Sequence, residues 1–208
     1  MPLLLLLLSL IFTGCHSPKE RHTTSVIVEG SARAPLYRFF LPEGWRVIFP
    51  DAAADLSDTT QPLCTCLLED MEGKMITITF HHFPTSNGER RIPPASQLAR
   101  WRRQFQLEAS DFDEQEVAWG GFYGRMIVGE GWRDEPMALQ AWSLLLCDEE
   151  YARLLGGEGK FSPAISRQMA ADVTIKAWGD PLLMEKRRSE VVAIAGSFGL
   201  LHPLPPSR

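Results

Sequence analysis

The chain has 208 residues, and its hydrophobic fraction of 45% and charged fraction of 23% are ordinary for a globular protein. This length suits one domain with a sizeable core. The formal net charge of −5 argues against nucleic-acid binding, which requires a basic surface, and we expect no nucleic-acid partner.

The first segment of the chain is a short apolar run that ends in Thr-Gly-Cys. Residues 3–12 are almost entirely apolar, but a helix that crosses a bilayer needs about 20 such residues. The run has the length of the hydrophobic region of a signal peptide, and the small residues Thr13 and Gly14 suit a cleavage site. The stretch "FTGC" resembles the bacterial lipobox. This resemblance implies that residues 1–14 are a signal peptide and that Cys15 is lipidated. An uncleaved anchor, or a conventional signal with an incidental Cys15, are the alternatives.

The lipobox resemblance implies a location at the bacterial cell envelope, with the membrane as a partner through the anchor. Each buried CH₂ of an acyl chain contributes about 0.8 kcal/mol, so two or three chains hold a protein firmly. If the cell has two membranes, His16 after the modified cysteine favours the outer one, facing the periplasm. Residues 15–34 are then expected to be a tether, in which "TTSVIVEG" is compatible with a short strand.

From residue 35 the pattern is rich in strands. "PLYRFFLPEGWRVIFP" indicates strand, turn and strand, with the turn at Pro42 to Gly44. "LCTCLLED" and "KMITITFHHF" indicate two more strands joined by the tight connection "MEGK". In the second of them Ile76, Ile78 and Phe80 alternate with threonines, as in a half-buried strand.

The next predicted element is a helix in "ASQLARWRRQFQLE", where Leu98, Trp101 and Phe105 form one apolar stripe. We expect Trp45 and Trp101 to lie in the core. "EVAWG" and "GFYGRMIVGEG" then indicate two strands that hinge at Gly120 and Gly121.

The last predicted elements follow this hinge. "PMALQAWSLLLC" is expected to pair with "YARLLGG", and its apolar residues 144–146 place it in the middle of a sheet. A second helix is predicted from Pro163 to Trp178, with Ser162 as N-cap and Ile165, Met169 and Val173 as its buried stripe. Residues 181–208 are left as a C-terminal tail without a predicted element.

The order of these motifs resembles the Mog1/PsbP-like fold. "FLPEGWRV" is similar to the opening strand of that group, "RWRRQF" to a helix of some bacterial members, and "GGFYGRMIVGEG" to the hairpin after it. The resemblance covers residues 35–180 and implies an α+β domain in which an antiparallel β-sheet is sandwiched between helices (α/β/α). Members of this group act mostly as accessory or binding modules and share no catalytic set.

The cysteines other than Cys15 are Cys64, Cys66 and Cys147, an odd number that cannot pair completely. Cys64 and Cys66 share one face of a strand, and a bridge from either to Cys147 is possible if their strands are neighbours. The alternative, which we favour, is that they are buried as small hydrophobic residues. A metal site is not indicated, because no second cysteine cluster completes a ligand set.

No catalytic, metal or cofactor site is expected. His81 and His82 are adjacent on a strand, so their side chains point to opposite faces and cannot chelate together. "AGSFG" at residues 195–199 resembles a hydrolase nucleophile elbow, but no acidic residue follows Ser197.

The candidate binding surface is formed by the aromatic residues around the glycine hairpin, namely Trp119, Phe122, Tyr123 and Trp132, which would suit recognition if exposed. The arginines at 90, 91, 100, 102 and 103 are the densest positive group, either a patch for anionic headgroups or an acidic partner, or an ordinary solvated helix face. We therefore expect a non-catalytic, lipid-anchored envelope protein that binds a protein or small ligand. The alternative is an envelope hydrolase or metal-dependent enzyme assembled only in three dimensions.

Overall fold

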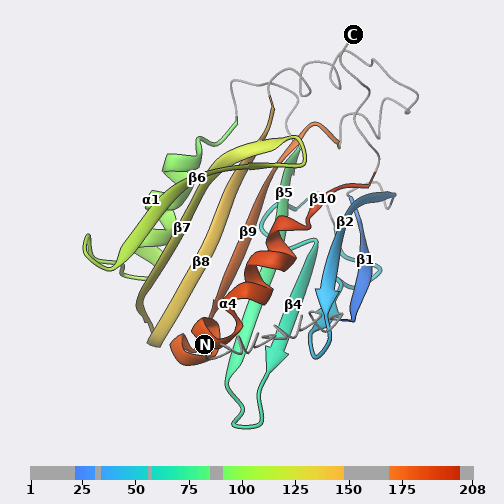
Figure 1. The fold of residues 1–208 in the computed structure, drawn as a ribbon. Helices are drawn as coiled ribbons and strands as arrows, with labels where there is room; N and C mark the ends of the chain where they lie inside the picture. Colours follow the sequence, from blue (N-terminus) through green and yellow to red (C-terminus); the bar gives the residue numbers. More distant parts are fainter. Residues whose placement is uncertain (1–21, 31–33, 56–57, 85–90, 148–168, 202–208) are drawn as a thin grey trace, which may run out of the picture.

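The computed structural model describes residues 22–30, 34–55, 58–84, 91–147 and 169–201, which form two antiparallel sheets and two helices (Figure 1). The helices are α1 (Pro94–Gln104) and α4 (Pro181–Gly196). The strands are β1 (Thr23–Glu29), β2 (Pro35–Pro42), β3 (Arg46–Ile48), β4 (Cys64–Glu69), β5 (Met75–Pro84), β6 (Phe112–Trp119), β7 (Phe122–Arg133), β8 (Glu135–Leu146), β9 (Ala171–Gly179) and β10 (Gly199–Leu200).

The large sheet has seven strands in the order β3-β4-β5-β9-β8-β7-β6. Strands β3 to β5 and strands β6 to β8 each follow one another in space as they do in sequence, and β9 enters between the two sets. The small sheet has the order β1-β2-β10. Every strand pair is antiparallel. Along each strand, successive side chains point to opposite faces of the sheet.

One face of the large sheet, here called the α4 face, is covered by helix α4 and the small sheet (Figure 1). Phe80 of β5 stacks on Phe39 of β2 at 4.7 Å between ring centroids and on Phe198 at 5.2 Å. Tyr37 of β2 stacks on Phe198 at 4.8 Å. These four rings are all buried, and they join the large sheet, the small sheet and the end of α4 in one core.

The C-terminal half of α4 is attached to this core by two polar contacts. Trp45 is buried, and its Nε1 donates to Glu190 Oε2 at 2.9 Å. At the end of α4, Ser197 Oγ accepts from the backbone N–H of Phe40 at 2.9 Å. The expectation that Trp45 lies in the core is therefore confirmed.

The opposite face of the sheet, here called the α1 face, holds a smaller core under helix α1. Leu98, Trp101 and Phe105 are buried against Ile127 and Leu139 of the sheet. Helix α1 packs on β7 and β8, and the backbone N–H of Trp132 donates to the carbonyl of Phe105 at 2.8 Å. The predicted helix and its apolar stripe are thus confirmed.

The fold class is the predicted one, an α+β arrangement with an antiparallel sheet between helices. The hairpins of β4 with β5 and of β6 with β7 are also confirmed. The turn of the β6–β7 hairpin is formed by Gly120 and Gly121, whose φ values of +58° and +86° suit glycine. Strand β8 lies between β7 and β9, as its apolar sequence predicts. Its predicted partner "YARLLGG" lies outside the described residues.

The helix predicted from Pro163 to Trp178 is wrong over the residues that the structure describes. Residues 171–179 form strand β9, which pairs with β5 on one side and β8 on the other. Val173, Ile175 and Ala177 face the α4 side, whereas the residues between them face the α1 side. This alternation with a period of two competes with the helical spacing, and burial between two neighbours decides it.

Helix α4 and strand β10 lie in the segment for which the sequence predicts no element. Asp180 caps the helix by accepting from the backbone N–H of Leu183 at 2.9 Å, and Pro181 occupies its first turn. Leu183, Met184, Val191 and Ile194 are buried on the sheet.

The N-terminal part of the described chain is already in a sheet. Strand β1 pairs along its whole length with β2, so the strand that the sequence allows in "TTSVIVEG" is confirmed. In the described part of the chain neither helix has the length and apolar character needed to cross a membrane.

We predict that Trp101→Ala lowers the free energy of unfolding by about 3–5 kcal/mol, because the side chain is buried and its loss leaves a cavity under α1. Urea denaturation followed by circular dichroism measures this change. Trp132→Ala is the matched control, since that side chain is 50% exposed and its removal leaves no cavity. Equal effects of the two substitutions would contradict the prediction.

Candidate functional site

The four aromatic residues predicted as a binding surface do not form one continuous surface. Phe122 is buried, and Trp119 is half-buried with its Nε1 donating to the carbonyl of Phe198 at 3.1 Å. Tyr123 is exposed but points to the opposite face from Phe122. Trp132 is exposed at the other end of β7. Recognition by Tyr123 or Trp132 stays a prediction.

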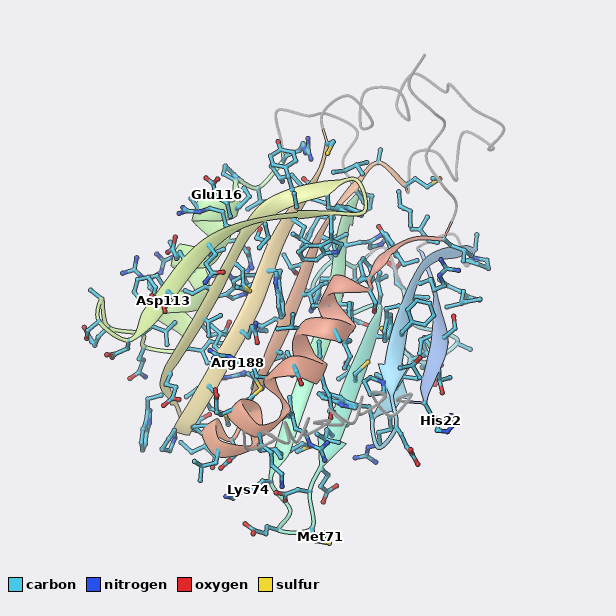
Figure 2. All side chains as sticks on the ribbon, in the orientation of Figure 1. His22, Met71, Lys74, Asp113, Glu116 and Arg188 are labelled. Atoms are coloured by element: carbon cyan, nitrogen blue, oxygen red, sulfur yellow. The ribbon has the colours of Figure 1, made fainter. Side chains whose placement is uncertain are left out.

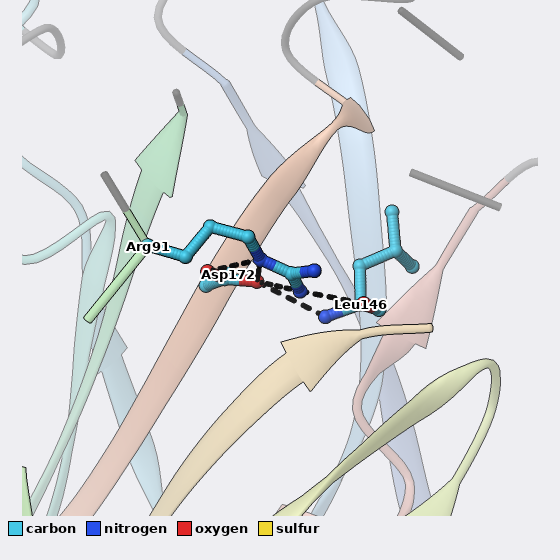
Figure 3. Close-up of polar contacts among 3 residues, drawn as sticks. All are labelled: Arg91, Leu146 and Asp172. Carbon is cyan, nitrogen blue, oxygen red and sulfur yellow. Dashed lines mark hydrogen bonds and ion pairs between the residues drawn. The ribbon is translucent and has the colours of Figure 1, made fainter. Parts of the chain in front are cut away.

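Arg91, from the positive group in the sequence, lies in a buried ion pair with Asp172 (Figure 3). Its Nε donates to both carboxylate oxygens, at 2.9 and 3.1 Å, and its Nη2 donates to Oδ1 at 2.6 Å and to the carbonyl of Leu146 at 2.5 Å. The backbone N–H of Leu146 donates to Asp172 Oδ1 at 3.1 Å. This pair joins the segment before α1 to the ends of β8 and β9, so its role is structural.

Of the other arginines in that group, Arg102 lies over the ring of Phe112 at 4.2 Å, whereas Arg100 and Arg103 are exposed on α1. Arg90 lies outside the described residues. Arg91 is therefore not available to a surface patch, and recognition by the exposed arginines of α1 stays a prediction.

A hollow of about 530 Å³ lies on the α4 face, between α4 and strands β6 to β8. Figure 2 shows Arg188 of α4 and Asp113 of β6 on the two sides of it. Its rim carries carboxylates from Asp113, Glu130 and Glu185, and Arg188 lies 3.6 Å from Glu185. The hollow is open and its charges are solvated.

A smaller hollow of about 200 Å³ lies on the α1 face, between the start of α1 and the ends of β5, β8 and β9. Gln97, Ser143 and Thr174 contribute polar side chains to its lining, and Phe83 and Ile92 contribute apolar ones. The carboxylate of Asp172 also lies there, bound to Arg91. The hollow thus combines apolar walls with neutral polar groups, as small-ligand sites do.

Three cations gather on the α1 face near Phe105, and we call them the Lys176 cluster: Arg100, Arg133 and Lys176. The Nζ of Lys176 lies 5.9 Å from the ring centroid of Phe105 and 4.7 Å from that of Trp178. The guanidinium of Arg133 lies 5.8 Å from the same Phe105 ring. Burial, together with the charges of Arg133 and Arg100, lowers the pKa of Lys176 to about 8.

No acidic side chain of the described residues balances the Lys176 cluster. Among the ion pairs of the described residues, none includes Arg100, Arg133 or Lys176. In a chain with a net charge of −5, three cations without a carboxylate partner are an unfavourable local arrangement for the folded protein.

Two side chains of β5 complete the surroundings of the cluster. Thr79 lies directly opposite Lys176 in the pairing of β5 with β9, and its buried Oγ1 has no hydrogen-bond partner within the described residues. His81 lies on the same face, with Nδ1 3.3 Å from the carbonyl of Thr59. Burial lowers the pKa of His81, and the nearby charges of Lys176 and Arg100 act in the same direction, so the ring is neutral near pH 7.

The cysteines and histidines do not form a reactive arrangement in the described residues. Cys64, Cys66 and Cys147 are free, the first two are buried, and burial raises the pKa of Cys64, which fits the interpretation as small hydrophobic residues. Within the described ranges no group of three metal-binding side chains comes together. Neither of the two hollows described above has a histidine or cysteine in its lining.

Sequence reasoning misses the Lys176 cluster because its members come from three separate elements. Lys176 lies in a segment predicted as a helix, and Arg133 follows a glycine-rich strand. The alternation of Asp172, Thr174 and Lys176 with apolar residues is the one local signal that could have placed Lys176 on a sheet face.

Comparison with known proteins gives few matches. No family model matches the sequence, and no curated protein matches it. The chain is similar to a crystal structure of LpqN, a protein involved in cell envelope biogenesis of Mycobacterium tuberculosis. The match covers 88% of this chain and 93% of the LpqN chain, with 11% sequence identity and a TM-score of 0.49. The match to the solution structure of the cyanobacterial PsbP protein CyanoP from Synechocystis covers 88% of this chain and 96% of the CyanoP chain, with 10% sequence identity and a TM-score of 0.43. At these TM-scores neither likeness carries an argument about function, and membership of the Mog1/PsbP-like group stays a prediction.

We predict that Asp172→Ala lowers the free energy of unfolding by about 3–5 kcal/mol, because it leaves the buried guanidinium of Arg91 without its carboxylate. Glu185→Ala is the control, since it removes an exposed partner of Arg188 and changes stability by about 1 kcal/mol or less. Urea denaturation at neutral pH measures both. A small effect of Asp172→Ala would show that the ion pair does not hold the strand ends.

We predict that Lys176→Met stabilises the protein near neutral pH and that this gain disappears at high pH. The pKa of Lys176 is lower in the folded protein than in the unfolded chain, so the protonated amine destabilises the fold fully below pH 8. The penalty fades as the pH rises from about 8 to 10.5, where the amine is neutral in both states. Melting temperatures of both proteins over this range measure the difference, and a gain that is independent of pH would contradict the assignment.

Proposed function

We propose that this protein is a lipid-anchored, non-catalytic component of the bacterial cell envelope that binds a protein or small ligand through the α1 face of its sheet. The signal peptide would be residues 1–14, and the acyl chains would be attached to Cys15. The single observation that carries the binding role is the Lys176 cluster, which brings three cations together without a carboxylate partner in the described residues.

Support for the anchor comes from the spacing between Cys15 and the first strand. Because β1 begins at Thr23, eight residue steps separate it from Cys15, which is at most about 30 Å of extended chain. A lipid at Cys15 would therefore keep the folded domain close to the membrane surface.

Support for a binding role comes from the energetics of the Lys176 cluster. Interactions that stabilise a fold need no explanation beyond folding, but a lowered lysine pKa means that the native structure disfavours the charged amine. Groups held at such a cost are more common at functional sites than elsewhere.

We predict that Cys15→Ala moves the protein from the membrane fraction to the soluble fraction and abolishes its labelling by a fatty-acid analogue. Cys147→Ala is the control, because it also removes one free thiol but should leave both the fractionation and the labelling unchanged. The measurement is fractionation and labelling in a bacterial host. A Cys15→Ala protein that stays in the membrane and keeps its label would place the anchor elsewhere.

A further inference from the structure

We infer that the Lys176 cluster, together with the small hollow on the same face of the sheet, forms a binding site for a phosphoryl group. This inference names the ligand class for the proposed binding function and rests on it, but it is independent of the anchor at Cys15. The phosphoryl group is carried either by a lipid headgroup or by a small phosphomonoester, and the experiment below distinguishes these two sources.

The first argument is charge. Arg133 and Lys176 have their charged groups within 6 Å of one ring, that of Phe105, and the charge of Arg100 acts on Lys176 from α1. The nearest carboxylate on the same strand face is Asp172, which is bound to Arg91. A doubly charged phosphoryl group would offset the repulsion among the three cations, and guanidinium groups bind phosphate oxygens with two parallel hydrogen bonds.

The second argument is the unsatisfied hydroxyl of Thr79. Its Oγ1 is buried, has no partner within the described residues, and belongs to a residue that is only 8% exposed. A buried donor without an acceptor is costly, whereas a phosphate oxygen between Thr79 and Lys176 would accept from both. The pairing of β5 with β9 places these two residues directly opposite each other on the α1 face.

The third argument is the size and lining of the hollow. It measures about 200 Å³, which is less than the roughly 300–1,000 Å³ of pockets for drug-sized ligands and suits a small group. Thr174 lies two residues before Lys176 on the same strand face, and Gln97 lies one helical turn before Arg100. Lys176 and Arg100 are therefore close in sequence to residues that line the hollow, whereas Arg133 extends the site toward Phe105. Ser143, Thr174 and Gln97 add neutral hydrogen-bonding groups.

The aromatic side chains next to Lys176 fit the same ligand class. Trp178 lies 4.7 Å from the Nζ of Lys176 and is half-buried on the α1 face. Its ring can pack against the uncharged part of a phosphomonoester while the cations hold the phosphoryl group. A bare inorganic ion would use the cations but not this ring, so an organic phosphate should bind more tightly than inorganic phosphate.

The experiment uses the full chain purified in an uncharged detergent and in phosphate-free buffer. Glycerol 3-phosphate, inorganic phosphate and a short-chain phosphatidic acid are titrated into it separately by calorimetry. We expect saturable binding in at least one titration. Tighter binding of glycerol 3-phosphate identifies a small phosphomonoester, and tighter binding of the short-chain phosphatidic acid identifies a lipid headgroup. Absence of saturable binding in all three titrations overturns the inference.

Lys176→Met is the decisive variant, and Arg188→Gln is its matched control. Both remove one positive charge, but Arg188 lies on α4, on the other face of the sheet. We expect Lys176→Met to weaken binding by about tenfold or more, since it removes a charged hydrogen bond, and Arg188→Gln to leave it unchanged. Equal weakening by the two variants would mean non-specific attraction by net charge and would overturn the inference.

Thr79→Val separates a ligand-binding hydroxyl from a structural one. Valine has the same shape, so the variant should fold, and without the unsatisfied hydroxyl its melting temperature should be equal or higher. Binding of the phosphoryl ligand should nevertheless become weaker. Unchanged binding would overturn the place of Thr79 in the site. A protein that is labelled by the fatty-acid analogue at Cys15 but binds no phosphoryl ligand would leave the proposed anchor intact and reject only the ligand class.

Discussion

The structure depends on the stack of four buried rings formed by Tyr37, Phe39, Phe80 and Phe198. These rings come from β2, from β5 and from the residue pair after α4, which are far apart in the chain. Each ring contact adds about 0.5–1.5 kcal/mol to the burial of its apolar area. Because the stack attaches the small sheet and α4 to the same place on β5, it closes the α4 face and gives that face its continuous core.

The opposite face remains partly open for a geometric reason. Helix α1 has eleven residues, so it is about 16 Å long, whereas seven strands span about 29 Å. The helix therefore covers β7 and β8, and the α1 face of β4, β5 and β9 carries threonines and Lys176 instead of a second apolar core. A sheet with one dry face and one half-covered polar face can hold a ligand without disturbing the core that stabilises it.

Local patterns in the sequence identify the elements whose signal is local. The stripe of Leu98, Trp101 and Phe105 predicts α1, and alternation predicts β5. Strand β9 is missed because Ser162 and Pro163 suggest a helix start. The choice between a period of two and a helical period at Val173 depends on its neighbours His82 of β5 and Leu144 of β8, which only the folded sheet brings beside it. Helix α4 is missed because its apolar residues lie at its two ends, around a charged centre. The Lys176 cluster depends on tertiary contact, so no spacing in the sequence contains it.

The insertion of β9 between two earlier sets of strands has a consequence for the order of assembly. Strands β3 to β5 and β6 to β8 can pair as hairpins during synthesis, but their union requires residues near position 175, close to the end of the chain. Contacts at such separations form slowly, because a long loop must close first. The polypeptide therefore lacks its complete sheet until synthesis is nearly finished. Under the lipoprotein proposal, this delay keeps the chain unfolded while it passes through a translocation channel.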